Sequence, residues 1–237
     1  MTTNTTAAPP AAKTGNRRHR RRGIYYGAFL IIALFVWVAV DLYTPRRASL
    51  RDFDADEVAR LDTAMWRSYY ARERLRLFGQ LAELLRTQYG LPFWRSNAVA
   101  FRAAKAAFVF KDGRARADYE RALPDLVSFY QSVRAVADTD FDPGRAARLE
   151  LEWWIVHRER REHAPGDLER ALASLAAELY RVSPERLAEH ARLRAEAMEI
   201  RDTQAERGGV NEEDWARIDE LLHRSWRSLH AAVNDGR

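Results

Sequence analysis

Five titratable side chains fall where the helical period of this sequence predicts apolar, buried faces. Carboxylates and imidazoles that converge between helices can hold a metal ion or a small ligand. Glu152 lies within an apolar stripe that also contains a tryptophan, whereas Glu150 and His157 follow a neighbouring line of the same predicted helix. The candidates for one buried polar cluster are Arg72, Glu73, Glu152, His157 and His190.

The same side chains can instead satisfy one another. Burying an unpaired charge costs several kcal/mol, so a carboxylate on an apolar face needs a partner. Arg67, Arg72 and Arg74 are close enough to pair with these carboxylates. An Arg–Glu–Tyr network that fixes the helix register is therefore the favoured interpretation, and a ligand pocket is the alternative.

Sequence motifs for metal and cofactor chemistry are incomplete. A di-iron bundle needs two Glu-x-x-His motifs, and the chain has one, Glu220 to His223. The step from Glu152 to His157 puts the two groups on different faces of a helix. The chain has no Cys, no P-loop and no Gly-x-Ser-x-Gly elbow, so thiolate sites are excluded and hydrolase or nucleotide chemistry has no starting point. We expect no catalytic residue, metal or cofactor, and an enzyme is the less favoured class.

The basic charge of the chain is confined to one end. The formal net charge is +5, but residues 1–47 hold eight Lys and Arg against one Asp. The remaining 31 basic and 33 acidic side chains leave residues 48–237 with a charge near −2. Nucleic-acid binding requires a net basic face, so we expect no nucleic-acid partner.

An uncharged stretch, GIYYGAFLIIALFVWVAV, lies between Arg22 and Asp41. As a helix it is about 27 Å long, close to the roughly 30 Å of a bilayer core, which predicts a transmembrane helix over residues 24–43. The stretch is longer than the apolar part of a signal peptide (about 7–15 residues) and lacks a small-x-small cleavage pattern, which favours an uncleaved signal anchor over a cleaved signal. The predicted membrane-interface anchors are Arg22, Tyr25, Tyr26, Trp37 and Tyr43.

The charges that flank this stretch predict its orientation. Six cations precede it and three follow within residues 44–52, and the basic side of a span stays in the cytoplasm. We therefore expect a cytoplasmic N-terminus and an extracytoplasmic C-terminal domain, on the periplasmic or extracellular side. The predicted parts are a disordered basic tail over residues 1–23, the span over 24–43, a linker over 44–52 and one soluble domain over 53–237.

Helix start and stop signals dominate the soluble part, which predicts an all-α fold of about seven helices arranged as a bundle or an array of helical hairpins. Asp54, Asp142 and Asn211 have the residue types of N-caps, while Gly90 and Pro124 mark an end and a kink. The expected helices cover residues 54–89, 93–111, 115–137, 142–163, 167–181, 183–206 and 211–233. A repeated D-x-E-R-A-L-x-x-L pattern leaves open whether the hairpins over 115–163 and 166–206 are a duplication.

These observations favour a single-pass membrane protein whose helical domain acts in protein interaction or scaffolding. The expected partners are the lipid bilayer and another membrane or extracytoplasmic protein. The alternative is a ligand- or metal-binding helical-bundle enzyme that uses a buried Glu/His cluster. An enclosed pocket lined by Glu73, Glu152, His157 and His190 would favour the alternative, whereas paired carboxylates and an exposed apolar surface would favour the interaction role.

Overall fold

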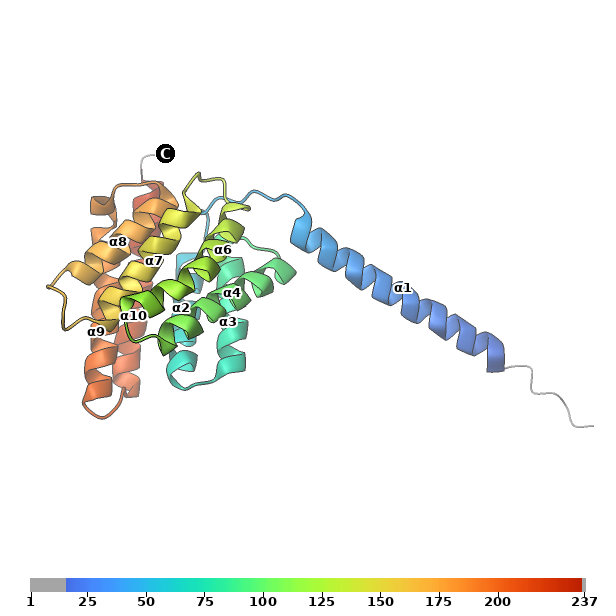
Figure 1. Cartoon of the computed structure of the whole chain (residues 1–237), viewed down its shortest axis with the longest axis horizontal. Helices are drawn as coiled ribbons and strands as arrows, with labels where there is room; N and C mark the ends of the chain where they lie inside the picture. Colours follow the sequence, from blue (N-terminus) through green and yellow to red (C-terminus); the bar gives the residue numbers. More distant parts are fainter. Residues whose placement is uncertain (1–15, 236–237) are drawn as a thin grey trace, which may run out of the picture. The chain divides into compact units, whose positions relative to one another are not determined.

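The computed structural model describes residues 16–235, with side chains from residue 24 onward, and divides into two compact units, residues 1–44 and 45–237 (Figure 1). The first unit is one helix, α1 (Asn16–Tyr43). Its apolar part, Ile24–Tyr43, has a mean hydropathy of 2.1 and matches the bounds predicted for the span. Its length and composition fit a membrane anchor and a signal sequence alike. The helix begins earlier than expected because residues 16–23 extend it; the predicted disorder of residues 1–15 lies outside the described residues.

The second unit is all-α, as expected, and has more helices than the seven predicted. Its elements are α2 (Ala55–Tyr70), α3 (Arg74–Tyr89), α4 (Phe93–Asp112), α5 (Arg116–Tyr119), η1 (Glu120–Ala122), α6 (Leu123–Arg134), α7 (Pro143–Arg158), α8 (Asp167–Tyr180), η2 (Pro184–Leu187), α9 (Ala188–Glu206) and α10 (Glu212–Asn234). The η elements are short 3₁₀ turns.

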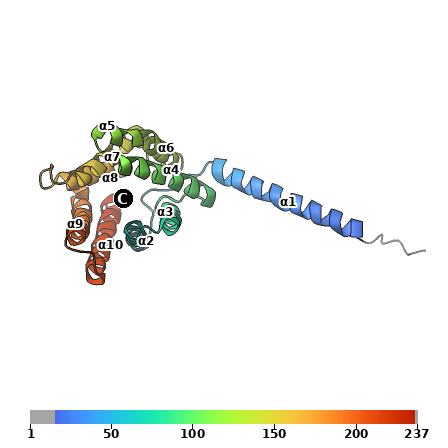
Figure 2. The ribbon, with the colours of Figure 1, turned by 60° about the horizontal axis from the view of Figure 1, so that its bottom comes forward.

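The long helices of this unit form a closed ring. Each of α2, α3, α4, α6, α7, α8, α9 and α10 packs against the next one along the chain, and α10 packs back against α2 (Figure 2). A single layer of helices therefore surrounds a central axis. The sequence left a bundle and an array of hairpins open, and the observed arrangement is a succession of neighbouring helices whose two ends meet.

Three predicted N-caps begin helices as expected. Asp54 accepts hydrogen bonds from two backbone N–H groups of the first turn of α2, and Asp142 does the same for α7. Asn211 forms a complete capping box with Asp214 at the start of α10. At Asp54 the third residue of the helix, Glu57, pairs with Arg60 and does not complete a capping box.

The prediction of one continuous helix over residues 54–89 is wrong, because the chain forms two helices there, α2 and α3. The chain turns at Ala71–Glu73, where Arg72 takes a left-handed φ of 61° and the Glu73 N–H donates to the Ser68 carbonyl at 2.9 Å. The turn lets α3 pack against α2 instead of extending it. No Gly or Pro marks the site, so turn chemistry offered no signal.

Proline positions account for two other divisions. The segment predicted over residues 115–137 consists of α5, η1 and α6, with Pro124 in the first turn of α6. The segment predicted over 183–206 begins with a 3₁₀ turn at Pro184 before α9. A proline at these positions fits the start of a helix, because the first-turn N–H groups have no intrahelical acceptor.

The segment expected as a linker is partly built into the second unit. Leu50 is fully buried, and the backbone of Ala48 exchanges hydrogen bonds with Val136 and Asp138 at 2.7 and 3.0 Å. The Arg51 guanidinium donates to the carbonyls of Tyr180 and Val233 at 2.8 and 3.0 Å. These carbonyls lie at the C-terminal ends of α8 and α10, where backbone acceptors lack partners within their own helix.

Candidate functional sites

The five residues predicted to form one buried polar cluster lie at separate places. Arg72 and Glu73 are exposed in the turn between α2 and α3. Glu73 pairs with Arg76 at 3.2 Å and is within 3.5 Å of the Ser68 hydroxyl. The expected apolar environment of Arg72 and Glu73 depended on a continuous helix over residues 54–89, and the turn removes it.

Glu152 and His157 lie on α7 but contact different partners. Glu152 is 41% exposed at its side chain and pairs with Arg116 at 2.8 Å. His157 Nε2 lies 3.0 Å from Asp202 Oδ2. Burial opposes ionisation of Asp202, but hydrogen bonds from His157 and Arg201 outweigh it and hold the pKa of Asp202 below its ordinary value. Each of these contacts is a satisfied pair.

His190 is buried as expected, on the inner side of α9. Its Nδ1 lies 3.0 Å from the Ser225 carbonyl and 2.8 Å from the Ser225 hydroxyl, so α9 and α10 are joined there. Burial and the nearby Arg194 cation lower the pKa of His190 to about 4. The imidazole is therefore neutral at physiological pH.

A cavity of about 160 Å³ lies within the helical ring. Seven of the eight ring helices contribute side chains to its wall, and α4 does not. Leucine and aromatic side chains make up most of the wall. The polar groups that border it include Asp62, Gln88, Tyr130, Glu150, His190 and Arg194. His190 is the one residue of the predicted cluster that borders this cavity.

The carboxyl group of α7 that borders the cavity is Glu150, whereas the sequence predicted Glu152. The Tyr130 hydroxyl donates to Glu150 Oε2 at 2.7 Å, and the Trp154 indole donates to Oε1 at 2.9 Å. Burial raises the pKa of Glu150 above its ordinary value, and the neighbouring Tyr130, Trp153 and Trp154 side chains and the Arg194 cation only partly oppose the rise. Glu150 and Glu152 point about 200° apart on the helix, so only one of them can face the ring interior.

The other charged groups of the cavity wall are paired. The Arg194 guanidinium donates to Asp62 at 2.5 Å, and the Trp226 indole donates to the same carboxylate at 2.9 Å. Gln88 donates to the Tyr180 hydroxyl at 3.2 Å. Among the side chains of residues 24–235, by contrast, Glu150 has no ion pair with a Lys, Arg or His.

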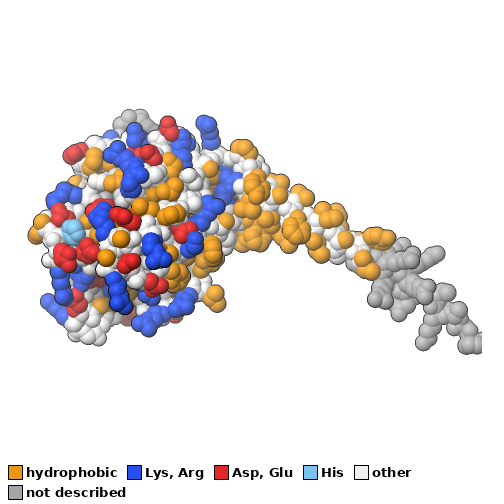
Figure 3. Space-filling view, viewed as in Figure 1, with side chains coloured by type: hydrophobic (Ala, Val, Ile, Leu, Met, Phe, Trp, Pro, Cys, Tyr) orange, Lys and Arg blue, Asp and Glu red, His pale blue; other side chains and the backbone are white. Residues whose placement is uncertain are grey.

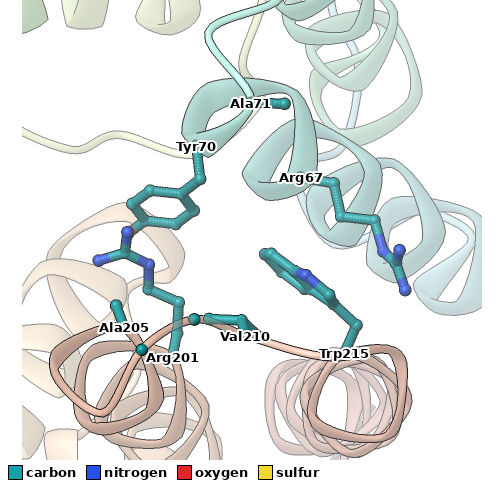
Figure 4. A pocket seen from close by; sticks show the side chains of 9 residues that line it. Arg67, Tyr70, Ala71, Arg201, Ala205, Val210 and Trp215 are labelled. Carbon is teal, nitrogen blue, oxygen red and sulfur yellow. The ribbon is translucent and has the colours of Figure 1, made fainter.

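A second hollow is an open groove of about 550 Å³ at the end of α2 beside the α9–α10 connection (Figure 4). The Arg201 guanidinium carbon lies 3.2 Å from the centroid of the Tyr70 ring, and that of Arg67 lies 5.0 Å from the centroid of Trp215. Both guanidinium groups are already paired: Arg67 with Glu212 and Arg201 with Asp202, at 2.9 and 2.8 Å. The groove therefore presents neutralised cations, which join α2 to the α9–α10 hairpin.

The outer face of α4 carries exposed aromatic side chains. Phe93, Phe101 and Phe108 follow a helical spacing of eight and seven residues, and they are 47%, 64% and 50% exposed. Lys105 lies beside this row and pairs with Asp125 at 2.9 Å. The visible face of the second unit elsewhere interleaves acidic and basic side chains (Figure 3).

No group of three or more His, Asp or Glu side chains within the described residues has a geometry that would hold a metal ion. Comparisons with protein-family models, curated proteins and solved structures found no match to this chain. The candidate sites are therefore assigned from geometry and chemistry alone.

Proposed function

We propose that this chain is a single-pass membrane protein whose ring-shaped helical domain recruits another membrane or extracytoplasmic protein through the outer face of α4. One observation carries the proposal: Phe101 and Phe108 are 64% and 50% exposed along one face of α4. Burying a phenylalanine side chain yields about 1.5–3 kcal/mol, so this row gives a partner a favourable place to dock.

The rest of the domain supports an interaction role over catalysis. Glu73 and Glu152 are paired with arginines on the surface, and His157 is paired with Asp202. The predicted Glu/His cluster is not assembled, which removes the geometric support for an enzyme that uses it. Because α4 contributes nothing to the cavity wall, its outer face can bind a partner without altering the ring interior.

The proposed topology places the N-terminus in the cytoplasm and the ring on the opposite side of the membrane. The support is the exposed apolar surface of Ile24–Tyr43, where Phe29 and Leu30 are 67% and 66% exposed, together with the excess of cations before it. A phosphatase reporter that is active only outside the cytoplasm, fused after Arg237, should be active. An active cytoplasmic reporter at the same point would reverse the orientation, and release of the chain by alkaline carbonate would remove the anchor.

Site-specific photo-crosslinking in cells tests the docking face. A photoreactive residue in place of Phe101 should give one discrete protein adduct, because the partner lies within contact distance. The matched control is the same residue in place of Arg192, which is exposed on α9 among its own acidic partners. The adduct should disappear when Phe108→Asp is added to the same chain.

The crosslinking result separates the possible occupants of the face. Adducts with lipid alone would show that the α4 face rests on the bilayer, and this would overturn the protein-recruitment role. Equal yields of adduct from positions 101 and 192 would show non-specific contact, and this would also overturn the protein-recruitment role. Phe101→Asp and Phe108→Asp should each leave the free energy of unfolding within about 0.5 kcal/mol of the wild type, because the side chains are exposed.

A further inference from the structure

We propose that the cavity at the centre of the helical ring is a binding site for a small organic ammonium ion, held by Glu150. The inference is independent of the docking role of α4, since α4 borders no part of the cavity. It rests on the charges and the side-chain types of the cavity wall.

The charge of the cavity wall favours a cation. Asp62 and Arg194 neutralise each other at 2.5 Å, and the buried His190 is neutral. Glu150 is the remaining acidic group of the wall, and it has no ion pair with a protein cation among the side chains of residues 24–235. Its ionised form therefore gives the wall one negative charge that no protein cation balances. A ligand with one positive charge would make the site neutral.

The remaining hydrogen-bonding capacity of Glu150 fits an ammonium group. An ionised carboxylate offers about four acceptor positions, and the Tyr130 hydroxyl and the Trp154 indole occupy one on each oxygen. The free positions can accept N–H groups from a ligand. A carboxylate or phosphate ligand is disfavoured because it would face the charge of Glu150.

The other wall residues supply an aromatic environment. Tyr89, Tyr130 and Trp153 border the cavity, whereas the Trp226 ring, which also borders it, already lies 5.6 Å from the Arg194 guanidinium carbon. The face of an aromatic ring attracts a cation, and the attraction is strongest where water is excluded. The combination of one unpaired carboxyl group and several rings suits an alkylammonium ion better than a neutral alcohol of the same size.

The volume of the cavity limits the ligand. A water molecule occupies about 30 Å³ in the liquid, so 160 Å³ holds roughly five non-hydrogen atoms. Isobutylammonium has this size and carries one charge. Isobutanol has the same carbon skeleton and is neutral, which makes the two molecules a matched pair of probes.

Binding should be linked to the protonation of Glu150. A cation binds the ionised carboxylate, so affinity should fall as pH decreases through the range where Glu150 takes up a proton, and binding should release that proton. The groups facing Glu150 across the cavity are Asp62 of α2, Tyr89 of α3, Tyr130 of α6, Tyr180 of α8, and His190 and Arg194 of α9. Of these, His190 becomes charged only in acid, where its charge would weaken cation binding further.

The test is calorimetric titration of the full chain in a neutral detergent with isobutylammonium and with isobutanol. The expected result is saturable binding of the amine at least about tenfold tighter than the alcohol. The measured heat of amine binding should change with the ionisation enthalpy of the buffer, because the released proton is taken up by the buffer. Glu150→Gln should weaken amine binding by about tenfold or more and leave alcohol binding unchanged. The control variant Glu152→Gln, whose side chain pairs with Arg116 on the surface, should bind the amine as the wild type does.

Three outcomes would overturn the proposal: equal affinity for the amine and the alcohol, unchanged amine affinity in Glu150→Gln, or no saturable amine binding at millimolar concentrations. If Glu150→Gln fails to fold, the wild-type chain still decides the matter. The indole N–H resonance of Trp154 should then move on titration with the amine and stay in place with the alcohol, because this N–H is bonded to Glu150. A Trp154 resonance that moves with the alcohol and stays in place with the amine would contradict amine binding at Glu150.

Discussion

Burial in the ring interior disfavours the charged forms of both Glu150 and His190. The effect raises the pKa of the carboxyl group and lowers that of the imidazole. Burial thus makes Glu150 harder to ionise and His190 harder to protonate. Their contributions to stability nevertheless depend on pH in opposite directions.

The residue-scale prediction concerns His190. Its pKa is about 4 in the folded chain and near 6.5 when unfolded, so the unfolded chain binds more protons between these values. The stability from neutral His190 is complete above about pH 6.5 and is lost as pH falls toward 4, by about 3 kcal/mol. Guanidinium unfolding followed by tryptophan fluorescence should show this loss in the wild type and much less of it in His190→Asn. His223→Asn serves as the control and should retain the wild-type slope.

The individual residues also show what sequence patterns can and cannot resolve. The helical period correctly predicted that His190 is buried, because apolar residues surround it at positions on the same face. It also placed Glu150 on the neighbouring line that contains His157, yet it selected Glu152 as the buried carboxylate. Choosing between carboxylates two residues apart requires knowledge of which arc of α7 faces the ring interior, and that arc is fixed by the neighbouring helices α6 and α8.

At the scale of the elements, local chemistry predicted where helices begin better than where they bend. Asp54, Asp142 and Asn211 cap helices because side-chain oxygens satisfy first-turn N–H groups, an interaction encoded within four residues. The turn at Arg72 has no comparable local sequence signal. It exists because α3 gains contacts by folding back on α2, which is a tertiary effect that local sequence does not report.

The turn at Arg72 gives a prediction about backbone strain. Arg72 holds a φ of 61°, its side chain is exposed, and a non-glycine residue in this region pays about 1 kcal/mol or more. Arg72→Gly should raise the free energy of unfolding by about 0.5–1 kcal/mol, after the entropy that glycine adds to the unfolded chain. The control Arg74→Gly, in the first turn of α3, should lower it. A loss of stability in Arg72→Gly would show that the arginine side chain holds the turn.

Arg51 connects two helix ends, and its removal tests that connection. Its guanidinium donates to last-turn carbonyls of α8 and α10, and hydrogen bonds from a charged donor are worth about 1.5–3 kcal/mol. Arg51→Ala should therefore lower the free energy of unfolding by about 2 kcal/mol. Arg60→Ala removes only a surface pair with Glu57 and should change it by less than about 0.5 kcal/mol. Equal effects would show that Arg51 acts only as a surface charge.

On the scale of the whole molecule, the closed ring explains features that an open hairpin array would lack. The two ends of the second unit meet, because Asn234 donates to the Arg51 carbonyl at 3.1 Å. The seam between α2 and α10 is held by Trp226 and Asp62 inside and by Arg227 and Asp56 outside, at 2.9 and 2.6 Å. Sequence periods define the helices, but this closure joins residues more than 160 positions apart, which no local pattern specifies.

Ring closure predicts how the domain opens. In an open helical array, terminal helices contact one neighbour and exchange their amide hydrogens first. Because α2 and α10 have two neighbours each, their amides should exchange with nearly the same opening free energy as those of α7 and α8. Native-state hydrogen exchange of the full chain measures this. Trp226→Phe removes the indole donor to Asp62 at small cost in volume, so it should speed exchange in α2 and α10 before α7 and α8 are affected. If α2 and α10 already exchange much faster than α7 and α8 in the wild type, the seam contributes little, and the cavity that it encloses would be accessible through it.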